Sequence, residues 1–144
     1  MGLFRKKPPL PLWHFPVLLL LSGCGEAGPE CGSADARNSV IRIVADNRNN
    51  ALVNFAVKNS SSVEEMLGHA NSEAEKTAVL EQAKQGAIYS LDDTVANSRK
   101  PRTAVCTGLL SVTVGDTTAQ KEVEFRVEQA ADGKTSVSVS PFLF

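Results

Sequence analysis

Two segments, "TAVCTGLLSVTV" at residues 103–114 and "KEVEFRVEQ" at residues 121–129, decide the fold that this sequence predicts. In the second segment an apolar side chain alternates with a charged one, which is the period of a strand with one buried face. The first segment places these apolar side chains on one face: Cys106, Leu110, Val112 and Val114. Gly115-Asp116 between the segments is typical of a tight turn, so we expect an antiparallel hairpin.

Two further strands are expected on either side of this hairpin. Residues 87–97 place Tyr89, Leu91 and Val95 on one face, and residues 135–142 alternate Val137 and Val139 with serine. Asp132-Gly133 marks the turn before the last strand. Four consecutive strands with short connections predict an antiparallel meander, and its one apolar face requires a covering layer of helices.

The residues before the strands supply helices. Apolar side chains recur at steps of three and four between residues 34 and 58, and Ser33 can cap the start, so we expect one long amphipathic helix there. Asn47, Asn49 and Asn50 interrupt its middle and form either a binding patch or a solvated part of the helix.

Two capping-box patterns follow, Ser62-x-x-Glu65 and Ser72-x-x-Glu75. They predict a short helix over 63–69 and a longer one over 73–85 that Gly86 closes. The second helix carries few large apolar residues and should bury little. The predicted fold class is α+β: helices packed on one face of a four-stranded meander in two layers.

The amino end has the composition of an export signal. Arg5, Lys6 and Lys7 are the only charged residues of the first 23, and they precede an apolar stretch that is too short and proline-interrupted for a spanning helix. From Cys24 onward the chain has 12 basic and 16 acidic residues, a formal charge of −4. A mildly acidic domain without a basic run is a poor partner for nucleic acid.

Leu21-Ser22-Gly23-Cys24 resembles the lipobox of bacterial lipoproteins. That resemblance implies that residues 1–23 are cleaved as a signal peptide and that Cys24 carries the lipid. Acyl chains on this cysteine would hold the protein stably at a membrane. By resemblance to the sorting rule of enteric bacteria, Gly25 in place of aspartate favours the outer membrane. Residues 24–32 then form a short tether before a single domain over 33–144.

Lipidation of Cys24 leaves two cysteines, Cys31 and Cys106. In an oxidising compartment we expect them to form a disulfide that joins the start of the helical segment to the sheet. Two unpaired buried thiols are the alternative.

The order of helix and four strands is similar to small cystatin-like and NTF2-like folds and to other periplasmic lipoproteins. This resemblance is architectural and carries no motif, so it implies no function.

Few residues after Cys24 offer catalytic chemistry. His69 is the one remaining histidine, and the sequence contains no pattern for a metal site, a nucleophilic triad or a phosphate-binding loop. We therefore expect no cofactor, no metal, no small-molecule substrate and no catalytic residues. The enzyme alternative is a small α+β barrel in which Tyr89, Asp93 and His69 converge in a pocket.

Two features could contact a partner. Thr135 and the serines at 136, 138 and 140 form a polar ladder on the last strand, which is either an edge that accepts a partner strand or a plain solvated face. Pro141 to Phe144 either dock into the core or contact a partner or membrane.

The sequence thus predicts a lipid-anchored periplasmic protein that acts as a non-catalytic binding or structural module of the envelope and has a protein partner there. An inhibitor, immunity or exclusion-type lipoprotein is the alternative within the same class.

Overall fold

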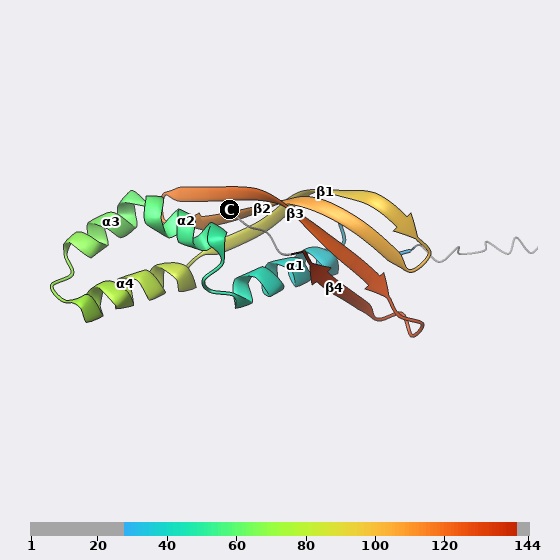
Figure 1. Cartoon of the computed structure of the whole chain (residues 1–144), viewed down its shortest axis with the longest axis horizontal. Coiled ribbons are helices and arrows are strands. Elements are labelled where there is room, and N and C mark those ends of the chain that lie inside the picture. Colours follow the sequence, from blue (N-terminus) through green and yellow to red (C-terminus); the bar gives the residue numbers. More distant parts are fainter. Residues whose placement is uncertain (1–27, 141–144) are drawn as a thin grey trace, which may run out of the picture.

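The computed structural model describes residues 28–140, which form an α+β domain (Figure 1). In chain order its elements are α1 (Ala34–Asp46), α2 (Ala51–Asn59), α3 (Ser61–Gly68), α4 (Glu73–Gln85), β1 (Ile88–Lys100), β2 (Thr103–Val114), β3 (Thr117–Gln129) and β4 (Thr135–Val139). The strands form one antiparallel sheet in the order β1-β2-β3-β4. The predicted meander is confirmed.

Both predicted turns use a glycine in the left-handed region, Gly115 at φ 55° and Gly133 at φ 82°. Gly115 is also packed closely: a Cβ at this position would overlap the Ser62 hydroxyl oxygen. Only glycine fits both the dihedral angle and the contact.

The core lies between the sheet and the first two helices. Helix α1 packs against β1 and β4, and α2 packs against β2 and β3. The predicted inward faces of the central strands are buried, with Phe125 at their centre opposite Cys106. Burial of these apolar side chains is the main stabilising term of the fold. Helices α3 and α4 pack on each other and on α2, and form one end of the molecule (Figure 1).

One long helix over 34–58 was a wrong prediction. The chain leaves the helix after Asp46 and starts a second one at Ala51. Asn50 is the N-cap of α2, and its side chain accepts a hydrogen bond from the N–H of Val53 at 2.9 Å. In an uninterrupted helix the N–H of Val53 would bond to a backbone carbonyl in the preceding turn. At the start of a new helix this acceptor is missing, and the side chain of Asn50 replaces it.

The start of the third helix also differs from the prediction. Ser60, and not Ser62, is the N-cap of α3, so the helix begins at Ser61. The second capping pattern is confirmed: Ser72 caps α4 by accepting from the N–H of Glu75 at 3.2 Å, and Gly86 is the C-cap. Helix α4 has no buried residue, as its composition predicted.

Val95 does not share the inward face of β1. Leu91 is 2 % exposed, whereas Val95 is 57 % exposed, because the pairing of β1 with β2 shifts between Asp92 and Val95. Asp93 adopts a positive φ of 49° inside this bulge. An extra residue at a bulge reverses the alternation beyond it, which places Val95 on the outer face.

Candidate functional site

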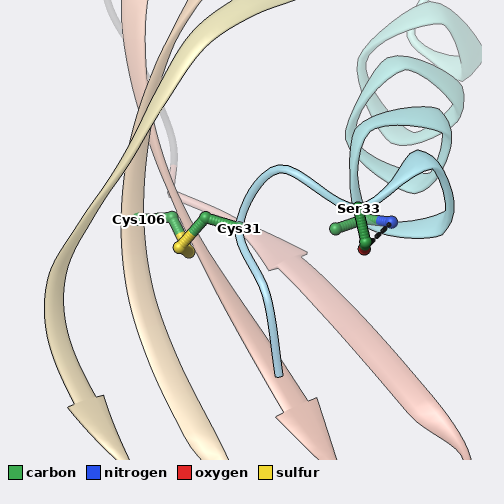
Figure 2. The surroundings of a disulfide bond; sticks show 4 residues. Cys31, Ser33 and Cys106 are labelled. Atoms are coloured by element: carbon green, nitrogen blue, oxygen red, sulfur yellow. Dashed lines mark hydrogen bonds between the residues drawn. A yellow bond between two sulfur atoms is a disulfide. The ribbon is translucent and has the colours of Figure 1, made fainter. Parts of the chain in front are cut away.

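The predicted pairing of Cys31 with Cys106 is present as a disulfide with an S–S distance of 2.03 Å (Figure 2). Both cysteines are buried, at 2 % and 0 % exposed. The bond joins residues 75 apart in sequence and ties the segment before α1 to the first half of β2. Ser33 follows at once as the N-cap of α1, where its hydroxyl accepts from the N–H of Ala36 at 3.2 Å. Helix α1 is therefore fixed to the sheet at its first turn.

The predicted lipid-attachment residue Cys24 lies outside the described residues, as do the signal peptide and Pro141 to Phe144. The described chain begins at Gly28, beside the turn between β1 and β2. A Cβ placed on Gly28 would lie 3.2 Å from the carbonyl oxygen of Pro101 in that turn. The chain thus enters the domain at this end of the sheet.

The same turn carries a basic cluster, although the sequence predicted a domain without a basic run. Arg99, Lys100 and Arg102 are all exposed. The signal was present as "SRKPR" at residues 98–102, but three charges in a mildly acidic domain did not stand out.

At the opposite end of the sheet, Asp116 joins the β2–β3 turn to the start of α3. Its carboxylate accepts hydrogen bonds from the hydroxyls of Ser60, Ser61 and Ser62 and from the N–H of Ser62. These bonds, led by Ser61 and then Ser60, hold the pKa of Asp116 well below its ordinary value of 3.8. A carboxylate at a helix N-terminus is also favoured by the helix dipole. The arrangement is a structural clamp between two loops.

The asparagine cluster has a structural use that neither sequence alternative described. Asn50 is 5 % exposed, and its amide nitrogen donates to the Tyr89 hydroxyl at 3.0 Å and to the backbone carbonyls of Val44 and Asn47. Asn47 and Asn49 are exposed. The cluster joins α1, α2 and β1 through one buried amide.

The structure does not bring Tyr89, Asp93 and His69 together. Tyr89 bonds to Asn50, Asp93 is exposed in the β1 bulge, and His69 is exposed at the C-cap of α3. Tyr89 lines two surface pockets, one with α1 and one near Ala45 and Lys84, and neither includes Asp93 or His69.

Strand β4 is an edge of the sheet. Thr135, Ser136 and Ser138 are exposed, and Ser140 is half-buried. The strand is only five residues long, and edge strands of folded proteins are often short because a long free edge invites unwanted pairing.

A shallow pocket of about 520 Å³ lies between α2, α3 and α4. Leu67 of α3 and Leu80 of α4 line it, together with Lys84. Lys84 is held in place, since its ammonium group donates to Asn49 at 2.7 Å and lies 3.9 Å from Glu81. The pocket thus has mixed polar and apolar walls without a concentration of reactive groups.

Within residues 28–140 no group of three or more histidine, cysteine, aspartate or glutamate side chains is placed to hold a metal ion. In the same part of the chain, no helix has the length and apolar character needed to cross a membrane.

No protein-family model matches the chain, and no curated protein or solved structure matches it either.

Proposed function

We propose that this protein is a lipid-anchored protein of the bacterial envelope, acylated on Cys24, whose domain binds a protein partner and catalyses no reaction. The buried disulfide between Cys31 and Cys106 is the single observation that carries the proposal. Stable disulfides are typical of exported proteins, and this one uses both cysteines of the folded domain. Cys24 is then the one thiol left for a lipid, at the position where the lipobox resemblance requires it.

The proposed location is the periplasm, with the outer membrane favoured by Gly25. Cys31 follows Cys24 by seven residues, which span at most about 25 Å when fully extended. A disulfide at Cys31 attaches the end of this tether directly to the core. The domain is thus held close to the membrane surface.

The free edge of β4 is the proposed contact for a protein partner. The N–H of Ser140 donates to Glu124 in β3 at 2.9 Å, and the N–H of Ala130 donates to Lys134 at 2.8 Å. Backbone groups alternate in direction along a strand, so Thr135, Val137 and Val139 direct theirs away from β3. An extended segment of a partner could pair with these groups.

The enzyme alternative gains no support from the arrangement of its residues. The hydroxyl of Tyr89 accepts a hydrogen bond from Asn50. Neither of the two pockets that Tyr89 lines includes Asp93 or His69.

Labelling of cells with radioactive palmitate tests the anchor. We expect the whole chain to incorporate label, the Cys24→Ala variant to incorporate none, and the matched Cys31→Ala/Cys106→Ala variant to retain it. Label that persists in Cys24→Ala, or no label in the native chain, would contradict the proposal.

Photo-crosslinking in cells tests the partner surface. A photoreactive residue at exposed position 136 should give one discrete adduct, whereas the same residue at position 71, between α3 and α4, should give none. Thr135→Pro should abolish the adduct without lowering the thermal stability, because the N–H that it removes is not bonded to β3. An adduct that survives this substitution would exclude strand pairing at β4.

A further inference from the structure

The turn between β1 and β2 carries three cations at one end of the molecule. Arg99, Lys100 and Arg102 flank or form this turn, and all three side chains are exposed. None of them forms an ion pair with another residue of 28–140. We call Arg99 to Arg102 the basic tip.

The basic tip has a fixed backbone. The carbonyl of Arg102 accepts from the N–H of Gln129 in β3 at 2.8 Å, and Lys100 pairs with Thr103 across the turn. The backbone that carries the charges is thus part of the pairing at the end of the sheet, and the three side chains are exposed.

The described chain begins at the same place. Gly28 lies against the backbone of the tip, where its Cβ position is 3.2 Å from the Pro101 carbonyl oxygen and 3.5 Å from that of Lys100. Figure 1 shows the described chain starting at the end of the sheet where β1 and β2 meet, with α3 and α4 at the other end.

The reach of the tether places this end at the membrane. Gly28 follows Cys24 by four residues, which span at most about 14 Å when fully extended. At physiological ionic strength the field of a charged surface extends over a Debye length of about 8 Å. Gly28, which lies against the backbone of the basic tip, is thus confined within about two Debye lengths of the lipid headgroups whenever Cys24 is acylated.

We propose that the basic tip binds anionic phospholipid headgroups beside the lipid anchor and so fixes the orientation of the domain on the membrane. This inference rests on the proposed acylation of Cys24. Arginine and lysine near a membrane surface are attracted to anionic lipid, and each raises the ratio of bound to unbound tip by about fivefold.

The acidic residues near the basic tip do not neutralise its positive charge. Glu128, across the sheet from Thr103, already pairs with Arg126 at 3.6 Å. Glu30, two residues after Gly28, is exposed and has no ion pair with a described residue. The tether also carries Glu26, so the three cations stand against two carboxylates, Glu26 and Glu30, and the excess is one positive charge.

This contact would direct α3 and α4 away from the bilayer. The β2–β3 turn and the start of α3, joined through Asp116, lie at the far end of the sheet from the tip.

Tryptophan fluorescence of the acylated protein tests the proposal. The sequence has one tryptophan, Trp13, inside the predicted leader, so Pro101→Trp introduces a single fluorophore into the processed chain. The variant is reconstituted into vesicles of brominated phosphatidylcholine, with or without brominated phosphatidylglycerol. Asn71→Trp, at the opposite end of the domain, is the matched control. Intact mass of each sample reports whether Cys24 is acylated.

We expect phosphatidylglycerol to increase quenching at position 101 severalfold and to leave position 71 unquenched. High salt, or Arg99→Gln/Lys100→Gln/Arg102→Gln in the Pro101→Trp chain, should return quenching to the level of phosphatidylcholine alone. An acylated sample with equal quenching in both vesicles would overturn the headgroup contact and leave the anchor intact. A sample without acyl groups would overturn both.

Discussion

Loss of the disulfide should cost a large share of the stability of the domain. The bond closes a loop of 75 residues. The chain-entropy model assigns about 15 cal/mol/K to such a closure, or about 4.5 kcal/mol at 25 °C. A domain of this size has a total stability of about 5–15 kcal/mol. Cys31→Ala/Cys106→Ala should therefore lower the free energy of unfolding by about 4.5 kcal/mol.

Urea unfolding followed by circular dichroism measures this change. The oxidised chain from Cys24 with Cys24→Ser is the reference, and the same chain after reduction is the control without a change in sequence. Both the reduced chain and the double variant should unfold at lower urea with a similar loss. A difference under about 1 kcal/mol between oxidised and reduced chains would refute the reasoning, since a constraint on the unfolded chain would then contribute little.

Three further changes test the packing and the loop contacts. Phe125→Ala removes a side chain that is 1 % exposed, and should lower the free energy of unfolding, measured with urea, by about 3–5 kcal/mol. Asn50→Ala removes a helix cap and the buried partner of Tyr89, and should lower the free energy of unfolding by about 1–3 kcal/mol. The control Asn38→Ala changes an exposed residue and should alter the free energy of unfolding by no more than about 0.5 kcal/mol. Equal effects of the two substitutions would contradict the role of the cap. The pKa of Asp116 is lowered in the folded state, so its contribution is complete above its unfolded pKa near 3.8 and is lost as the pH falls toward the lower folded value. Asp116→Asn should therefore reduce the acid-dependent loss of stability below about pH 4, and an unchanged pH profile would show that the serine contacts are weak.

The strands could be predicted because the alternation of apolar and polar side chains is a local signal. The disulfide could be predicted because only two cysteines remain once Cys24 is assigned to the lipid. The alternation from Glu122 to Glu128 allows one buried face, and the β2 bounds agree with the prediction. Strand β3 begins earlier than predicted, at Thr117, because its first residues continue the hairpin pairing without large apolar side chains.

The errors arise where one residue changes the periodicity. Asn50 favours a helix cap over a helix interior, but whether it does so depends on the tertiary contact with Tyr89. Asp93 reverses the face of Val95 through a bulge, and aspartate tolerates the positive φ that the bulge requires. The period-two pattern assumes unbroken pairing and cannot report such a shift.

The basic tip could not be predicted from the sequence either. Arg99, Lys100 and Arg102 are three ordinary charges in the sequence. Their proximity to Gly28, and hence to the proposed anchor, follows only from the folded arrangement of the β1–β2 turn beside the start of the described chain.

Intact mass of the membrane-extracted protein, with and without reduction before thiol alkylation, is the most direct test of the lipid-anchored assignment. We predict a chain that starts at Cys24, carries acyl groups, and gains two alkylated thiols only after reduction. A chain that retains residues 1–23, or that has free thiols before reduction, would contradict it.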